Sequence, residues 1–237
     1  MNHLEWPRRV AALAQFSVQD LDAPVLGAPD EHHLRTVLRA KLDEEIVVTD
    51  DHGSWALCEV LANGVHRVSS VNVDPASERT TLYLAPLKGD RSEWTVAKAT
   101  ELGISHIVPL VSERLVVKFK GEHREKIVTR WRRVAKESCA QSRRTYGVQI
   151  GEPVRVAEVP DEVAVADLDG QPDWSGVRAV AIGPEGGWGP NEWSANRRRL
   201  LLGPTVLRGE TAGVVAASIL AFGAGGWGFT LGPSGNG

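Results

Sequence analysis

A glycine-rich segment at residues 182–192, IGPEGGWGPNE, has residue types that allow a backbone to lie close to a ligand. Glycine has no Cβ, so its backbone can approach a bound molecule and offer free N–H groups. The segment follows an apolar run at residues 177–182 and precedes a helix that we expect near Pro190. Because ligands of open α/β sheets bind at the carboxyl ends of strands, we predict a binding loop here. The alternative is that these glycines only turn the chain.

A second segment, residues 200–212 with the sequence LLLGPTVLRGETA, has a related design. A short apolar strand runs into a turn, and Glu210 and Thr211 open an alanine-rich helix. The unpaired amides of a helix start can hold a carboxylate or the edge of a base. Glu210 could equally do no more than complement the helix dipole.

Two common nucleotide-binding motifs are incomplete or missing. Gly187 and Gly189 resemble part of a dinucleotide fingerprint, but Glu192 stands where its third glycine belongs. No GxxxxGK[ST] phosphate loop occurs in the chain. These departures disfavour a nicotinamide site and a phosphate-loop nucleotidase.

The order of strand-like and helix-like segments after residue 75 predicts an α/β domain at residues 76–231. Apolar strands alternate with helices, which indicates a parallel sheet with right-handed crossovers. One face of the long second helix carries Ile127, Trp131, Val134 and Ser138, and Gly103 ends the first helix. The predicted strands are residues 80–87, 104–111, 163–168 and 177–182, and the predicted helices are residues 91–102 and 121–144.

Residues 1–75 predict a mostly β domain. Strands at residues 45–49, 54–61 and 66–73 are separated by turn residues, as in a small barrel. A short helix at residues 30–38, with Asp30 as its N-cap, is expected before them. Residues 74–77 are interpreted as a linker, and the Gly/Pro/Ser/Asn-rich tail at residues 232–237 as disordered.

Composition favours a soluble globular protein, since 42% of the 237 residues are apolar and 24% are charged. No membrane span or export signal is evident. The two cysteines, Cys58 and Cys139, fit reduced thiols in a cytoplasmic protein and exclude a disulfide framework or a zinc cluster. We expect no metal.

The net charge of −3 counts against a nucleic-acid binder, but arginines cluster locally. Such clusters can attract phosphate or can be solvated helix faces. They lie at residues 8–9, 132–133, 143–144 and 197–199.

Both C-terminal segments resemble the paired motifs of the ribosomal RNA small subunit methyltransferase E family, in the SPOUT superfamily. Lys88-Gly89-Asp90-Arg91-Ser92-Glu93 and Lys98-Ala99-Thr100-Glu101-Leu102-Gly103 are similar to that family's K-G-x-x-x-E and K-x-x-E-L-G patterns. Ser112-Glu113-Arg114, Gln141-Ser142 and His33 with Val37-Leu38-Arg39 match further motifs in the right order. Ala140, Arg143 and Val148 depart from the family pattern, where Glu, Gly and Pro are usual.

The resemblance implies a PUA-like RNA-binding barrel followed by a methyltransferase domain with a trefoil knot. It also implies a homodimer without a membrane partner, with a site near the subunit interface. The bound cofactor would be S-adenosylmethionine, held mainly by backbone groups of the two loops. By position, the cofactor-binding residues would be Ile182, Gly183, Glu185, Gly187, Leu202, Gly203, Leu207, Arg208 and Thr211.

The reaction that the resemblance implies is methylation of uridine N3 in 16S ribosomal RNA. Much of the catalysis of an in-line displacement comes from holding nucleophile and methyl in line. The uracil N3–H must lose its proton, so a base or a cation has to stabilise the resulting anion. Arg208 is our first choice for the cation and Glu210 for the base.

Basic residues of both domains are the predicted RNA contacts, and the target base is expected to be unpaired or flipped. Trp188 could stack on a base or belong to a core or dimer interface. The alternatives to an enzyme are a noncatalytic RNA-binding or ribosome-assembly module and, less favoured, a nucleotide-dependent oxidoreductase. The predicted RNA contacts are Arg8, Arg9, His33, Arg35, Arg39, Lys88, Arg91 and Arg144.

Overall fold

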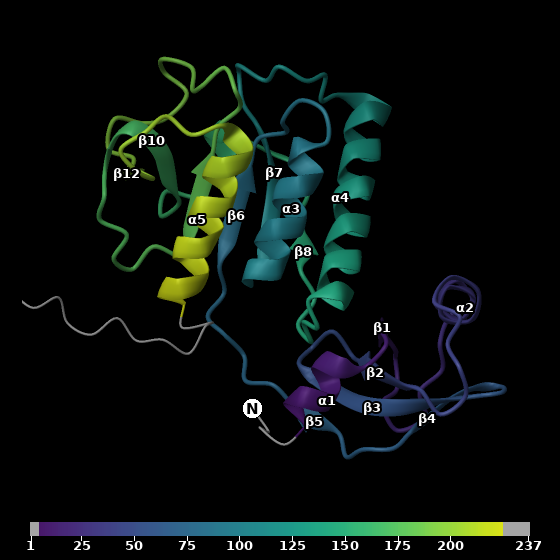
Figure 1. The fold of residues 1–237 in the computed structure, drawn as a ribbon. Helices are drawn as coiled ribbons and strands as arrows, with labels where there is room; N and C mark the ends of the chain where they lie inside the picture. The colour runs from purple at the N-terminus through teal and green to yellow at the C-terminus, as the bar shows by residue number, and fades with distance from the viewer. Residues whose placement is uncertain (1–4, 225–237) are drawn as a thin grey trace, which may run out of the picture. The chain divides into compact units, whose positions relative to one another are not determined.

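The computed structural model describes residues 5–224, which form two compact units (Figure 1). The N-terminal unit comprises residues 5–76 and 137–147, and the C-terminal unit comprises residues 77–136 and 148–224. The tail predicted to be disordered, residues 232–237, lies outside the described residues. Within residues 5–224, no helix is long and apolar enough to cross a membrane.

The N-terminal unit is built on one sheet, with strand order β1–β2–β3–β4 and β5 paired to β3. The predicted strands at residues 45–49 and 54–61 are confirmed, and they pair antiparallel. The single strand predicted at residues 66–73 is wrong, because Ser69 Oγ accepts the Leu57 N–H and interrupts it. The strands are β1 Gln15–Ser17, β2 Glu45–Thr49, β3 Ser54–Leu61, β4 Gly64–Arg67 and β5 Asn72–Val73.

Short helices flank this sheet. Helix α1, Trp6–Ala11, was not predicted, since six residues are too few for a periodic pattern. Helix α2, Ala28–His32, runs into a π-helical turn at His33–Val37, so the predicted helix at residues 30–38 is present. Its N-cap is Gly27 rather than Asp30, which lies in the first turn.

Asp74, predicted to belong to a linker, is instead a partly buried hub of hydrogen bonds in the N-terminal unit. Its carboxylate accepts hydrogen bonds from Arg9 Nη1 at 2.7 Å, Trp55 Nε1 at 3.2 Å and Thr145 Oγ1 at 2.8 Å. The Arg9 side chain is only 3% exposed and packs over the Trp6 and Trp55 rings. Asp74 thereby ties α1, β3 and the 142–147 segment together.

We expect Asp74→Ala to lower the free energy of unfolding by about 3–5 kcal/mol, because it leaves the buried Arg9 guanidinium without its carboxylate partner. Urea denaturation measures this. Asp22→Ala is the matched control, since Asp22 is exposed although it also contacts an arginine. Equal unfolding midpoints for the two variants would show that Asp74 is not a hub.

The C-terminal unit confirms the predicted α/β fold with a parallel sheet. Every strand pair in it is parallel, and the order is β12–β10–β11–β6–β7–β8, with β9 paired to β7. The strands are β6 Thr81–Leu84, β7 His106–Val111, β8 Gln149–Ile150, β9 Val154–Arg155, β10 Ala164–Gln171, β11 Ala179–Ile182 and β12 Arg199–Leu200. A short 3-10 turn, Val156–Glu158, follows β9.

Three helices of this unit start at the same end of the sheet (Figure 1). They are α3 Arg91–Leu102, α4 Gly121–Gln141 and α5 Gly209–Gly223, and residues 137–141 at the end of α4 belong to the N-terminal unit. Helix α3 ends at Gly103, whose φ of +106° is in the left-handed region that favours glycine. On α4, Trp131 is fully buried in the main core. Gly213 brings α5 against Thr95 of α3, so a side chain at residue 213 would collide.

The helix predicted to begin near Pro190 is wrong. Residues 190–198 form turns instead, and the chain re-enters the sheet at β12. Local turn residues explain this outcome, because Asn191, Ser194 and Asn196 favour turns over helix interiors.

Both cysteines are buried and form no disulfide with each other, as their positions in predicted structured elements indicated. Burial raises the pKa of the Cys58 thiol to about 12, which keeps it protonated and unreactive at neutral pH.

Candidate functional site

A cavity of about 680 Å³ lies in the C-terminal unit, at the carboxyl ends of β10, β11 and β12. Its volume falls within the range typical of small-molecule sites. The loop after β11 and the loop between β12 and α5 both line it. The two segments singled out in the sequence therefore form one pocket. Of the predicted cofactor residues, the lining includes Ile182, Gly183, Glu185, Gly187, Leu202, Gly203, Leu207 and Arg208.

Thr211 is the exception among those predicted residues. It is exposed in the first turn of α5 and is not part of the lining, whereas Ala212 is. Successive side chains of a helix point in directions about 100° apart, so Ala212 faces the pocket and Thr211 does not.

The loop after β11 depends on glycine at two positions. Gly187 has a φ of +67°, and a Cβ there would meet nothing within 4 Å, so this backbone faces open space. Gly183 lies against the Trp188 ring, which a Cβ would approach to 3.0 Å. Trp188 itself is fixed by a 3.0 Å hydrogen bond from Nε1 to the Ala166 carbonyl and by edge-on packing against Trp193. Trp188 thus forms a rigid wall of the pocket.

Glu192 anchors this loop to the end of β7. Its carboxylate accepts the Gly189 N–H at 2.8 Å, the Glu113 N–H at 2.6 Å and the Ser112 hydroxyl at 3.0 Å. The residue that broke the dinucleotide fingerprint is therefore a loop anchor.

We expect Glu192→Ala to accelerate amide hydrogen exchange at Gly189 and Glu113 by about tenfold, because both amides lose a charge-assisted hydrogen bond. Exchange read by mass spectrometry or NMR measures this. Glu152→Ala, an exposed carboxylate that pairs with Arg132, is the control. Unchanged exchange at both amides in Glu192→Ala would remove its anchoring role.

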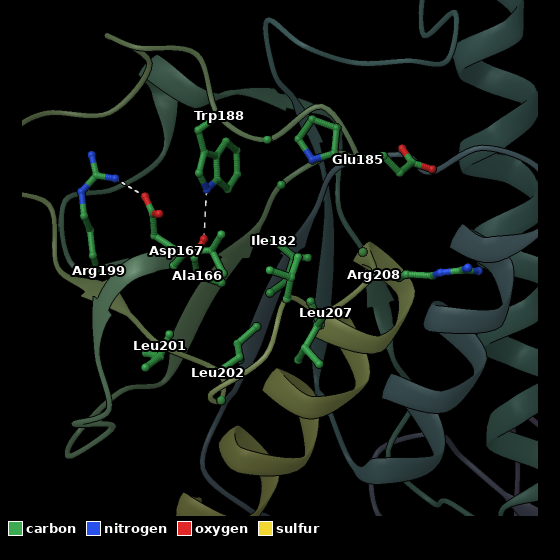
Figure 2. Close-up of a pocket in the computed structure, with 18 of the residues that line it drawn as sticks. Ala166, Asp167, Ile182, Glu185, Trp188, Arg199, Leu201, Leu202, Leu207 and Arg208 are labelled. Carbon is green, nitrogen blue, oxygen red and sulfur yellow. Dashed lines mark hydrogen bonds and ion pairs between the residues drawn. The ribbon is translucent and has the colours of Figure 1, made fainter.

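The wall opposite the α5 helix carries two charged residues that sequence reasoning missed. Asp167 and Arg199 form an ion pair in the lining, and Figure 2 shows them on the same side of the pocket as Trp188. Leu168 and Val206, which also belong to the lining, are 63% and 79% exposed. A signal for Asp167 did exist, because it falls at the carboxyl end of a predicted strand, where such sheets bind ligands.

A second charged cluster lies at the other side of the pocket. Arg91 Nη1 is 3.7 Å from Glu185 Oε1, and Arg91 Nε is 3.8 Å from Glu210 Oε1. Glu185 also accepts the Lys88 backbone N–H at 2.9 Å. Among the described residues, the buried Oε2 atom of Glu210 has no hydrogen-bond partner. In this cluster the Arg91 guanidinium lies between the carboxylates of Glu185 and Glu210, and one oxygen of Glu210 has no hydrogen-bond partner among the described residues.

Arg208 is the N-cap residue of α5 and is exposed. Its side chain points away from Leu202 and from the Trp188 wall (Figure 2). Within residues 5–224, no carboxylate lies within ion-pairing distance of its guanidinium. A free guanidinium at the rim of a pocket can bind a developing or existing negative charge.

Three of the predicted RNA-contacting arginines are engaged within the N-terminal unit. Arg9 is 2% exposed and bound to Asp74, so the prediction that it contacts RNA is wrong. Arg8 pairs with Glu45. Arg35 pairs with Glu31 at 2.9 Å and donates to the Gly64 carbonyl at 3.0 Å, which assigns it a structural role.

The other predicted RNA residues are more accessible. His33, Arg39 and Lys88 are exposed, and Arg91 and Arg144 are partly buried. Burial lowers the pKa of the Arg144 guanidinium. For His33, Arg39, Lys88, Arg91 and Arg144, contact with RNA stays a prediction.

Comparison with protein families identifies the chain. The RNA methyltransferase domain matches residues 74–221, and the RNA methyltransferase PUA domain matches residues 27–64. A ribosomal RNA small subunit methyltransferase E of Mycobacterium bovis is 30% identical over 219 residues, covering 81% of this chain and 83% of that protein. The chain belongs to the ribosomal RNA small subunit methyltransferase E family.

Solved structures agree with this assignment to the methyltransferase E family. One is a ribosomal RNA small subunit methyltransferase E from Neisseria gonorrhoeae bound to S-adenosylmethionine, with 25% identity and a TM-score of 0.74. The match covers 88% of this chain and 97% of the Neisseria gonorrhoeae chain. A Legionella pneumophila protein in complex with the same cofactor has 26% identity and a TM-score of 0.76, over 87% of this chain and 96% of that one.

Proposed function

We propose that this chain transfers the methyl group of S-adenosylmethionine to N3 of a uridine in 16S ribosomal RNA. The single observation that carries the proposal is the pocket shared by the loops after β11 and β12, in a chain of the methyltransferase E family. Relatives in that family are named for the ribosomal RNA of the small subunit.

The pocket has the properties that S-adenosylmethionine requires. Apolar side chains of Ile182, Leu202 and Leu207 give a surface for adenine (Figure 2). Gly187 and Gly203 have open space where a side chain would stand, so ligand atoms can contact their backbone. Glu185 also borders the pocket, and Thr211 lies just outside it. When bound, the cofactor supplies an electrophilic methyl group.

Two residues of the chain are proposed to prepare the uracil. The free guanidinium of Arg208 stabilises the negative charge that spreads over the uracil oxygens as N3 loses its proton. Glu210 accepts that proton, directly or through a water; within residues 5–224 its Oε2 atom is buried and has no hydrogen-bond partner. Arg91, 3.8 Å from the other oxygen of Glu210, holds that carboxylate in place.

We also propose the finer architecture that the family resemblance implies. Residues 1–75 are the PUA-like RNA-binding barrel and residues 76–231 the methyltransferase domain. The trefoil knot is proposed from the family resemblance; in the described structure α5 follows the edge strand β12 and packs on α3, β11 and β6. We further propose that the enzyme acts in the cytoplasm, where buried thiols such as those of Cys58 and Cys139 stay reduced.

A homodimer is supported by helix α5. Its residues 212–222 are all apolar, glycine or serine, and such a helix needs cover on every side. Val215, Ile219 and Phe222 are nevertheless only partly buried within this chain. We propose that a second copy covers them.

The test is mass mapping of methylated nucleotides in ribosomal RNA from cells that lack the protein, with complementation by the gene. Loss and recovery of one 3-methyluridine in 16S RNA is the expected result. A complete set of methylated uridines in the mutant would overturn the assigned reaction. Loss of subunit assembly without loss of methylation would point to the noncatalytic RNA-binding module.

A further inference from the structure

The segment that joins β7 to α4, together with the first half of α4, is strongly basic. Residues 114–133 contain eight lysine or arginine residues and two glutamates, in a chain whose net charge is −3. Positive charge that is concentrated in this way raises the local potential even when the whole protein is acidic.

Part of this charge is neutralised and part is not. Arg130 pairs with Glu93 at 3.1 Å, and Arg132 pairs with Glu152 at 2.5 Å. Nearer the start of α4, a group that we call the β7–α4 basic surface has no carboxylate within 4.0 Å among the described residues. It consists of Arg114, Lys118, Lys120, Arg124 and Lys126, all exposed.

Local packing holds part of this surface outward. Phe119 is 5% exposed, so it anchors the segment in the unit while its neighbours Lys118 and Lys120 remain in solvent. Lysines on an unfixed segment would spread their charge over many positions. Because the buried Phe119 fixes the backbone between Lys118 and Lys120, their positive charge stays in one place.

One member of the β7–α4 basic surface, Arg114, lies against the loop of the cofactor pocket, and the other members follow it along the segment that leads into α4. Helix α4 starts at the end of the sheet where α3 and α5 also start (Figure 1). Arg114 lies against the pocket loop, with Nη1 3.4 Å from the Gly186 carbonyl, and Glu192 ties that loop to Ser112 and Glu113. A polyanion on this surface would therefore lie beside the site of methyl transfer.

We propose that the β7–α4 basic surface binds the phosphate backbone of the RNA substrate, next to the nucleotide that enters the pocket. The inference rests on the proposed function. RNA is favoured over an acidic protein because the base must reach this edge of the sheet, and its flanking phosphates arrive with it. Contacts of this kind position the RNA without reading its sequence.

The test compares two triple variants. Lys118→Gln/Lys120→Gln/Arg124→Gln removes three charges from the proposed surface. Arg79→Gln/Arg178→Gln/Arg198→Gln removes three charges from exposed or partly exposed arginines. These arginines precede β6, β11 and β12, so they lie at the amino ends of the strands, opposite the pocket. The probe is transcribed small-subunit ribosomal RNA, with its Kd measured at several salt concentrations.

For the first variant we expect the Kd and KM for RNA to rise about tenfold or more. The slope of log Kd against log salt should fall by about two, as for the loss of three phosphate contacts. The turnover number at saturating RNA and the Kd for S-adenosylmethionine should stay within twofold. The control variant should keep wild-type RNA affinity and slope.

Two results would overturn the inference. One is that the first variant keeps wild-type RNA affinity and salt slope. Loss of binding to polyglutamate in that variant, with RNA binding unchanged, would assign the surface to an acidic protein and belongs to this result. The other is an equal loss in the control variant. Failure of the proposed function is a separate result, since the wild-type protein would then transfer no methyl group to the RNA.

Discussion

Gly203→Leu is expected to abolish binding of S-adenosylmethionine while leaving the fold intact. Gly203 lines the pocket, and a Cβ built on it meets nothing within 4 Å, so a leucine side chain enters the cavity itself. The φ of Gly203 lies outside the left-handed region, so the larger residue adds no backbone strain there. Calorimetric titration should show the Kd rising at least about a hundredfold, equivalent to roughly 2.7 kcal/mol.

Gly27→Leu is the matched control, because Gly27 has an ordinary φ of −66° and lies in the N-terminal unit. Gly187→Val should also block binding, but its φ of +67° adds strain, so its effect has two causes. Circular dichroism and thermal unfolding show whether each variant is folded. Wild-type affinity in a folded Gly203→Leu protein would place the cofactor elsewhere.

Arg208→Ala is expected to lower the turnover number by about 10²–10³-fold, the usual cost of removing one group that stabilises a developing anion. The Kd for S-adenosylmethionine should change little, because the side chain of Arg208 points away from Leu202 and the Trp188 wall (Figure 2). Single-turnover transfer of labelled methyl to the RNA measures the chemical step. Arg208→Lys should recover part of the rate, since it keeps the charge but not the planar fork.

Arg155→Ala is the control for this experiment, since Arg155 is exposed and lies outside the pocket lining. A single-turnover rate in Arg208→Ala equal to that of Arg155→Ala would remove Arg208 from the mechanism. A loss confined to RNA affinity would make it a phosphate contact instead.

Much of the fold could be predicted because its signals are local. The apolar runs that became β7, β10 and β11, the periodic face around Trp131 and the stop at Gly103 all lie within a few residues of the elements that they specify. The helix predicted after Pro190 is absent because local turn residues disfavour it. Glu192 also bonds to Ser112 and Glu113, about 80 residues away in the chain, and no local pattern reveals those contacts.

The pocket could be predicted for a different reason. The family resemblance implies that the loops around Gly187 and Gly203 hold one cofactor, and the carboxyl ends of parallel strands lie at the same end of a sheet. The strands before these loops, β11 and β12, are not neighbours, because β10 lies between them. Asp167 was overlooked because its neighbour Arg199 comes 32 residues later, and the pair becomes visible only in three dimensions.

Arginine pairs were the least informative signal. Arg8 and Arg9 are adjacent in the sequence, yet Arg9 is buried against Asp74 while Arg8 remains exposed. The side on which a residue of a short helix falls depends on the packing of the whole unit. The β7–α4 basic surface, by contrast, is defined only once the paired arginines of α4, Arg130 and Arg132, are set apart from the unpaired basic residues before them.

A crystal structure of this chain with S-adenosylmethionine tests the central claim most directly. We predict electron density for the cofactor between the loops at residues 183–189 and 201–208, with its adenine beside Ile182, Leu202 and Leu207. Density at any other place in the molecule, with this pocket filled only by solvent, would contradict the account.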